Sequence, residues 1–167
     1  AVCGTACRPA FRTPTAELAP DLDGRPGEPA RSTLKRWIAL CPGCGAAAPD
    51  LAALPPEAAD IVPRAEIQAE PDRFLRWSLF AAALGDAVAS AEAILQAAWH
   101  REDSGQDAAN LRRRAAANWP GDPLRQIDIL RRAGALPEAD ILAAALTGLD
   151  EDQRRILAFQ RERIAAA

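Results

Sequence analysis

The stretch CPGCG at residues 41–45 decides how the first third of this chain is interpreted. Two thiolates with two residues between them can reach one tetrahedral metal ion at a metal–sulfur distance of about 2.3 Å. Pro42 presets a tight turn between the two cysteines, and Gly45 tolerates the positive φ that often follows the second one. The stretch therefore predicts a knuckle, one half of a zinc site of the ribbon type.

The opening stretch AVCGTAC supplies the remaining two cysteines of the chain. Cys3 and Cys7 have a three-residue spacer, which lies within the range of about two to four residues that is usual in zinc sites. Four thiolates would fill the tetrahedron and leave no position for water or substrate, which is typical of a structural ion. We therefore predict a structural Zn²⁺ site with the ligands Cys3, Cys7, Cys41 and Cys44.

A second arrangement assigns a different role to Cys7. A glycine follows Cys3 as a glycine follows Cys44, and aligning these two pairs makes Cys3 the second cysteine of its knuckle. Its partner would then stand immediately before Ala1, and Cys7 would be an additional thiol. Disulfides or free thiols are the alternatives without a metal, and disulfides require an oxidising compartment that nothing else in the sequence indicates.

Length, charge and hydropathy limit the class of protein. The 167 residues suffice for one domain, or for a small module and a larger one, and the net charge is −3. Residues 1–70 hold seven basic and nine acidic residues, and residues 71–167 hold 13 and 14, which weighs against binding to nucleic acid. No uninterrupted apolar stretch approaches about 18 residues, so we expect no membrane span, and a cytoplasmic location.

Changes in composition divide the chain into three parts. Residues 1–54 contain all four cysteines and many Pro and Gly, and we expect a zinc-ribbon-like module. Residues 55–71 read as a proline-rich connector with at most a short helical turn. Residues 72–167 show apolar periodicities of helical spacing and predict five or six antiparallel helices joined by short turns. The expected helices cover residues 73–85, 86–103, 106–119, 123–134, 137–148 and 151–167.

Several local expectations concern how these segments begin, end and face the core. Asp72 and Asp150 suit the N-terminal caps of their helices, and Gly85 suits a helix end. Alternation within STLKRWI predicts a strand, with Leu34, Arg36 and Ile38 on one side and Trp37 on the other.

Other expectations concern charged and apolar side chains in the helical part and in one loop. We expect Arg112–Arg114 to form a solvated helix face and Asp128 to point away from the apolar side of its helix. The apolar side chains of the last helix expected to face inward are Ile156, Phe159 and Ile164. The motif PDLDGRP at residues 20–26 orders a loop by bonds of its carboxylates or forms a binding surface, and we favour loop ordering.

Nothing in the sequence indicates an active site. The only histidine, His100, has no second histidine with which to form a ligand pair, and we expect a partly exposed helix residue. No nucleophile motif surrounds a serine, and no glycine-rich loop that would cradle a phosphate occurs. We therefore expect no enzymatic activity and no catalytic residues.

The chain resembles a bacterial protein family with an N-terminal zinc ribbon and C-terminal tetratricopeptide-like helices. The motifs that carry the resemblance are VCG, PDLDGRP, STLKRW, CPGCG and APDL, followed by LQAAWHREDSG, LRRRAA, IDILRRAGALPEADIL and ILAFQRERI. The family implies a structural zinc ion and a helical interaction domain, without an established activity. The chain departs from the family's pattern at its start, where the first knuckle cysteine is absent.

Together these observations predict a mainly α protein, in which a small zinc-ribbon-like module precedes helical hairpins of the tetratricopeptide type. The expected function is that of a non-enzymatic adaptor with a structural zinc ion and a protein or peptide partner. The alternative to an adaptor is a zinc ribbon that binds nucleic acid through cations around Trp37, namely Arg8, Arg12, Arg31, Lys35 and Arg36. An enzyme that uses exposed Asp and Arg residues is the third hypothesis.

Overall fold

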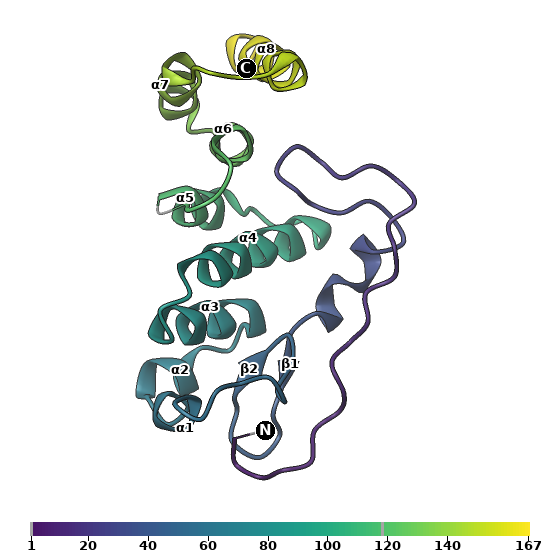
Figure 1. Cartoon of the computed structure of the whole chain (residues 1–167), viewed down its shortest axis with the longest axis vertical. Helices are drawn as coiled ribbons and strands as arrows, with labels where there is room; N and C mark the ends of the chain where they lie inside the picture. The colour runs from purple at the N-terminus through teal and green to yellow at the C-terminus, as the bar shows by residue number, and fades with distance from the viewer. Residues whose placement is uncertain (1, 118) are drawn as a thin grey trace.

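Helices make up most of the chain, as the sequence predicts, and they follow one another in a stack (Figure 1). The computed structural model describes residues 2–117 and 119–167. Its elements are η1 (Arg31–Arg36, a 3₁₀ helix), β1 (Ala39–Leu40), β2 (Ala47–Ala48), α1 (Ala58–Ile61), α2 (Ala65–Ala69), α3 (Arg73–Ala83), α4 (Ala87–Asp103), α5 (Ala109–Ala117), α6 (Pro123–Arg132), α7 (Leu136–Ala145) and α8 (Glu151–Ala165).

The helix boundaries follow from local capping chemistry. The Asp72 carboxylate accepts the backbone N–H groups of Phe74 and Leu75, with distances of 2.8 and 3.1 Å, and thereby satisfies two donors that the helix itself leaves free. Asp150 begins α8 in a capping box. Gly85 has a φ of +81°, the left-handed conformation that ends α3 and favours glycine. The predicted caps and the predicted stop are confirmed.

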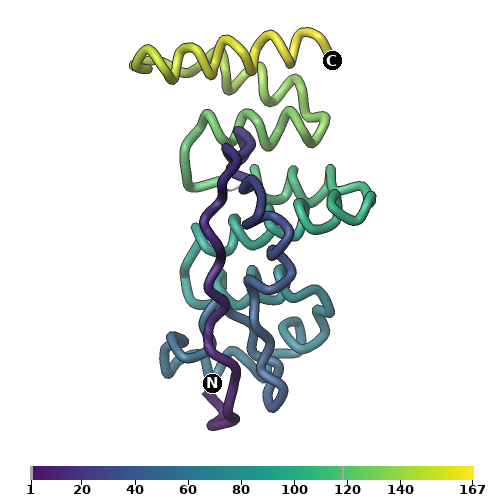
Figure 2. The backbone as a smooth tube through the Cα atoms, turned by 90° about the vertical axis from the view of Figure 1, so that its right-hand side faces the viewer, coloured from purple at the N-terminus to yellow at the C-terminus, as the bar shows by residue number. Residues whose placement is uncertain are grey.

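Each helix from α3 to α7 packs against the next, and α8 packs against both α6 and α7. The N-terminal segment runs along one side of this stack without regular structure (Figure 2). It rises from the cysteine end to the level of α6, reverses in the loop at residues 20–28, and returns through η1 to the β1–β2 hairpin. Loop and helices distant in sequence therefore lie side by side.

The strand expected at Leu34–Ile38 is not formed, because most of this segment belongs to the 3₁₀ helix η1. The Trp37 indole N–H donates to Thr33 Oγ1 at 3.0 Å, a bond between residues i and i+4 that an extended chain cannot make. Leu34 and Ile38 are both buried, whereas Arg36, expected on the same side, is exposed. The alternating pattern therefore does not describe this segment, because residues of a 3₁₀ helix share a face every three positions and not every two. The strand begins only at Ala39.

The apolar core consists of three clusters, and two of them join the N-terminal and the helical parts. The first combines Leu34 and Ile38 with Phe74, Leu95 and other helical residues. The second contains cysteine and alanine residues of the β1–β2 region together with residues from α1, α2 and α3. The third lies within α6, α7 and α8 alone. The first two clusters each contain residues from before position 54 and after position 71, so the apolar core is not divided at these positions. The division of the chain into a module, a connector and a helical domain stays a prediction.

The expectation of a solvated Arg112 is wrong, because this side chain is fully buried in an ion pair. Its Nη1 lies 2.6 Å from Oδ2 of Asp23 in the PDLDGRP motif, and its Nε lies 2.6 Å from Oε1 of Glu102. The Trp99 indole N–H donates to the same Asp23 oxygen at 2.9 Å. Arg113 and Arg114 are exposed, as predicted. Within the loop, Asp23 accepts the Arg25 backbone N–H at 3.2 Å, as loop ordering predicts, but the other partners of Asp23 are 76 to 89 residues away in sequence.

Two other side chains differ from expectation in the C-terminal helices. Asp128 is fully buried, and its carboxylate pairs with Arg131 and Arg132 one turn further along α6. Phe159 is 45% exposed, whereas Gln160 is buried and donates to the Leu124 carbonyl at 2.9 Å. Polar residues with partners therefore occupy core positions that apolar periodicity alone assigns to hydrophobic residues. The remaining expected core residues of α8, Ile156 and Ile164, are partly buried against the third cluster.

Replacing Asp23 by Ala tests the importance of the buried pair. The Arg112 guanidinium would keep Glu102 but lose its fully buried partner, and removing one member of a buried pair costs about 3–5 kcal/mol. We expect the free energy of unfolding, measured by urea denaturation, to fall by about 3 kcal/mol. The matched control is Arg155→Ala, whose exposed pair with Glu151 contributes at most about 0.5 kcal/mol. Equal losses in both variants would contradict the prediction.

Acid should weaken the same interaction. Burial raises the pKa of Asp23, but the charge and hydrogen bond of Arg112 outweigh it and hold the pKa below its ordinary value of 3.8. The stabilisation is therefore present above that value and lost as the pH falls through the lower folded-state pKa. We expect the stability difference between the wild type and Asp23→Asn to shrink on acidification from about pH 6 to about pH 3. A difference that grows with acid would overturn this assignment.

Candidate metal centre

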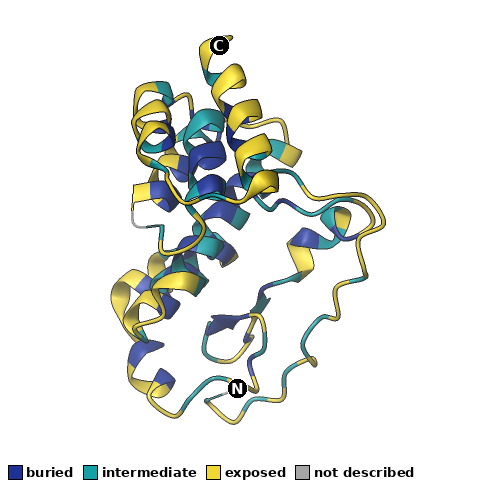
Figure 3. Ribbon diagram, turned by 45° about the horizontal axis from the view of Figure 1, so that its top comes forward, coloured by how far each residue is buried: buried dark blue, intermediate teal, exposed yellow. Residues whose placement is uncertain are grey.

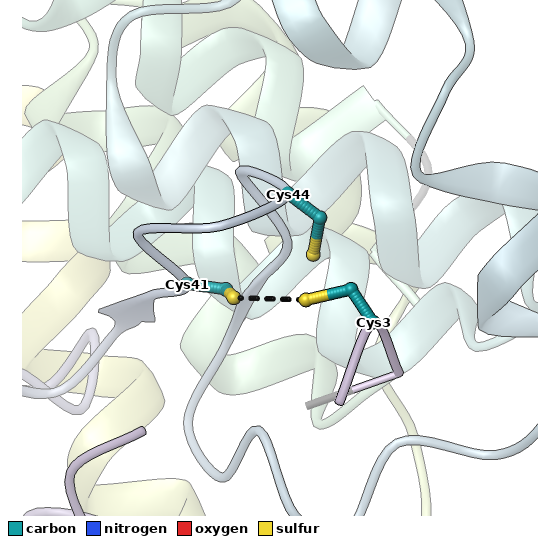
Figure 4. A group of neighbouring side chains, drawn as sticks. All are labelled: Cys3, Cys41 and Cys44. Carbon is teal, nitrogen blue, oxygen red and sulfur yellow. Dashed lines mark hydrogen bonds between the residues drawn. The ribbon is translucent and has the colours of Figure 1, made fainter. Parts of the chain in front are cut away.

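Three cysteines from two distant segments meet at one end of the molecule (Figure 4). The sulfur atoms of Cys3, Cys41 and Cys44 all lie within 4.8 Å of one another, and those of Cys3 and Cys41 are 3.6 Å apart. Sulfurs bound to a tetrahedral ion at about 2.3 Å lie roughly 3.8 Å apart, so the observed spacing fits such an ion. A disulfide needs about 2.05 Å, and all four cysteines are free.

The turn between β1 and β2 has the backbone of a knuckle. The backbone N–H groups of Gly43 and Cys44 act to lower the pKa of Cys41, and the N–H of Ala46 acts in the same direction on Cys44. Two backbone bonds close the turn, from Cys41 N to the Ala46 carbonyl and from Gly45 N to the Cys41 carbonyl, at 2.8 and 2.9 Å. N–H groups placed in this way can spread the negative charge of metal-bound thiolates, so the turn is compatible with a metal ligand pair.

Cys3 has the local backbone of the second cysteine of a knuckle. The N–H of Thr5, two residues on, is directed to the Cys3 sulfur, as the N–H two residues after Cys44 is directed to that sulfur. The glycines that follow the two cysteines, Gly4 and Gly45, both have a φ of +75°. This match supports the arrangement in which the partner of Cys3 precedes Ala1.

Cys7 lies beside the cluster but outside the group that meets within 4.8 Å. Its thiol donates a hydrogen bond to the Thr5 carbonyl at 3.4 Å, and its side chain packs against the second core cluster. Burial, followed by a contact with Cys41, raises the pKa of the Cys7 thiol. The structure thus brings together three of the four predicted ligands, and the role of Cys7 stays a prediction.

The three clustered thiols differ in acidity. Hydrogen bonds with the side chain and backbone of Thr5 lower the pKa of Cys3 to about 6, whereas burial raises the pKa of Cys44 to about 11. Burial also acts against ionisation of Cys41, but N–H groups of the turn outweigh it and lower its pKa. Near neutral pH the cluster therefore holds thiolate and thiol together, and a metal that binds all three must displace a proton.

Residues outside the cysteine motifs hold the knuckle against the helices. The Gln68 side-chain amide donates to the Cys44 carbonyl at 3.0 Å and to the Val62 carbonyl at 2.7 Å. The Arg76 guanidinium donates to the Gly45 carbonyl at 3.1 Å. Sequence reasoning missed both supports, because a bond from a side chain to a distant carbonyl leaves no pattern in the sequence.

The other candidate groups lie elsewhere. His100 is a partly exposed residue of α4, as predicted, and its ring centroid is 5.7 Å from that of Phe74. The hydroxyl groups of Ser78 and Ser90 form a hydrogen bond of 3.0 Å. The Ser32 hydroxyl donates to the Glu28 carboxylate at 2.6 Å. Within the part of the chain that the structure describes, the three cysteines form the one cluster of potential metal ligands.

Comparisons with known proteins do not extend this assignment. No protein-family model matches the sequence, and no curated protein or solved structure matches it significantly. The family resemblance, the zinc ribbon and the tetratricopeptide-like hairpins therefore stay predictions.

None of the described helices is both long enough and apolar enough to cross a membrane.

The fourth ligand can be identified by removing Cys7 in two versions of the protein. If Cys7 only substitutes for a preceding cysteine, Cys7→Ser weakens zinc binding in the chain as it stands. It then has no effect in a chain with one cysteine added directly before Ala1. The reason is that Cys3 has the backbone of the second cysteine of a knuckle. The first cysteine of that knuckle, which would supply the fourth ligand, then corresponds to the added residue. The measurement is competition for Zn²⁺ against a chromophoric chelator.

Cys41→Ser serves as the positive control and should weaken binding in both versions, because Cys41 belongs to the observed cluster. If Cys7→Ser weakens binding equally in the two versions, Cys7 is the fourth ligand and the match between Cys3 and Cys44 has no bearing on the metal.

Proposed function

We propose that this protein is a non-enzymatic adaptor whose N-terminal part is stabilised by a structural zinc ion and whose helices bind a protein partner. The observation that carries the metal part is that the thiol cluster forms one edge of an apolar core. Cys41 is 3% exposed and belongs to the second core cluster, together with residues such as Ile67 and Phe80. A metal held there would take the place of core packing.

The choice of zinc rests on the donor set. Soft thiolates in a tetrahedral arrangement favour Zn²⁺ or an iron–sulfur centre over hard cations, and the knuckle turn is typical of structural zinc sites. A thiolate-only set supports a structural role, because catalytic zinc keeps an open position and usually has histidine ligands. The N-terminal part has little regular structure, only η1 and two strands of two residues each. A segment of this kind gains stability from a metal that it cannot gain from its own core.

The interaction role rests on the helical stack. The pairs α3–α4 and α6–α7 are joined by tight turns at Gly85 and Gly134, and small buried residues, Ala91 and Ala139, lie in the following helices. Hairpins of this kind, packed each on the next, support the tetratricopeptide-like interpretation. Large apolar side chains are left exposed on the stack, with Ile141 at 71%. A single exposed apolar residue is common on protein surfaces, so Ile141 provides a position at which the interaction can be tested.

Removal of the metal should loosen one end of the molecule and leave the other intact. We expect chelation to increase amide hydrogen exchange in β1, β2, α1 and α2, whose residues surround the cysteines. Exchange in α7 and α8 should not change, because the third core cluster contains no residue of the cysteine region. The measurement is hydrogen exchange followed by mass spectrometry, before and after chelation. A uniform increase, or none, would contradict the structural role.

The partner role is tested by replacing one exposed aliphatic residue on the helical stack with Glu and comparing it with the same change at an exposed aliphatic residue outside the stack. Cross-linking and mass spectrometry should recover a reproducible partner with the wild type and with Leu18→Glu, a control in the irregular N-terminal segment that is 63% exposed. Ile141→Glu should lose that partner, because the substitution places a charge on the helical surface. Recovery of the same partner with all three proteins would argue against the helical surface. Turnover of a small substrate would argue against an adaptor.

A further inference from the structure

A groove with a volume of about 760 Å³ lies between the extended segment at residues 6–12 and the η1–β1 region. Basic side chains come to it from three elements: the N-terminal segment, η1 and α3. None of its lining residues is acidic. The cations that line it are Arg8, Arg12, Lys35, Arg36 and Arg73. These five, all exposed, are referred to below as the groove cations.

The groove cations keep their charges free for a ligand. Among the described residues, no ion pair within 4.0 Å joins any of them to a carboxylate. Other arginines of the chain do have carboxylate partners, for example Arg25, Arg112 and Arg125. Arg73 is held in place without being neutralised, since it donates to the backbone carbonyls of Lys35 and Ile38 at 2.8 and 3.2 Å.

The groove also contains a stacked pair of planar groups. The guanidinium carbon of Arg36 lies 4.0 Å from the centroid of the Phe11 ring, and the two residues come from opposite walls. Arginine planes and aromatic rings are the surfaces on which unpaired bases stack in single-stranded nucleic acids. Arginine also binds phosphate through two parallel N–H groups, and four of the five groove cations are arginines.

We propose that this groove binds single-stranded nucleic acid. Its cations would lie along the phosphates, and the Phe11–Arg36 pair would receive a base. A concave groove between two chain segments admits one extended strand, whereas a duplex presents a wide convex surface. The stacked pair favours nucleic acid over an acidic peptide, because Asp and Glu side chains offer no planar aromatic surface to it. The proposal is independent of the adaptor function, which concerns the helical stack.

The negative net charge of the chain weighs against binding to nucleic acid, but the position of each charge matters more than the sum. Acidic residues outnumber basic ones in the chain, but several carboxylates are already paired with arginines in and around the loop at residues 20–28. Arg31, which the sequence placed among the candidate nucleic-acid contacts, pairs with Asp103 at 2.8 Å and does not line the groove. Other cations without a carboxylate partner, such as Arg64, Arg113 and Arg161, lie elsewhere on the described chain, but the five groove cations share one groove that has no acidic lining residue.

The test uses the metal-loaded protein and fluorescein-labelled 12-mers of thymidine and uridine, with binding followed by fluorescence anisotropy. Affinity should fall with salt, with a slope in log–log form of about −0.7 for each phosphate contacted and therefore as steep as roughly −3.5. The double variant Arg12→Glu with Lys35→Glu should reduce that slope by about 1.4 and weaken binding. Phe11→Ala should weaken binding about tenfold and leave the slope unchanged, because it removes stacking alone.

The matched control is Arg155→Glu with Arg161→Glu, which makes the same change in net charge on exposed residues of α8. It should bind as the wild type does, and circular dichroism and zinc content verify folding of every variant. Absence of binding at about 20 mM salt, or equal weakening by the control pair, would overturn the proposal. Tighter binding of a duplex would do so too. Equal competition by a 12-mer of glutamate would identify an acidic peptide as the ligand instead.

Discussion

The ion pair between Asp23 and Arg112 is the interaction on which the placement of the N-terminal half depends. Both side chains are fully buried, so neither charge has water as an alternative partner. The Trp99 indole and the Arg25 backbone N–H donate to the Asp23 carboxylate, and Glu102 accepts two further hydrogen bonds from Arg112. Because Asp23 belongs to an irregular loop and its partners Trp99 and Arg112 belong to α4 and α5, the pair fixes that loop to the helical stack. In Figure 3 the chain that leads to this loop is largely exposed, whereas Asp23 and Arg25 of the loop are buried.

The cysteine cluster and this ion pair hold the two ends of one segment. Cys3 is anchored beside the knuckle, Asp23 is anchored on α5, and no backbone–backbone hydrogen bond of the described chain involves residues 6–12 between them. This stretch, which only side-chain contacts such as the Phe11–Arg36 stack hold in place, forms one wall of the cationic groove. The position of this wall therefore depends on what holds the segment at its two ends, the cysteine cluster and the buried ion pair.

Local chemistry explains which parts of the fold the sequence predicts. Helix starts at Asp72 and Asp150 and the stop at Gly85 each depend on bonds within a few residues, so they can be inferred without knowing the fold. The knuckle at Cys41 and Cys44 is equally local, and its geometry follows from the two-residue spacer and the glycine after it. The sequence thus determined a mainly helical chain with thiol ligands near its N-terminus.

The tertiary structure decided which charged residues are buried and which are free. Arg112 and Asp128 look like solvated helix residues until their partners are known, because a charge can be buried only beside an opposite charge that the sequence does not point to. The same holds for the groove cations, which have no such partner among the described residues and which the fold brings to one groove. Composition adds charges along a chain, whereas folding cancels some of them in pairs and leaves a remainder. Only the arrangement in space determines where that remainder lies.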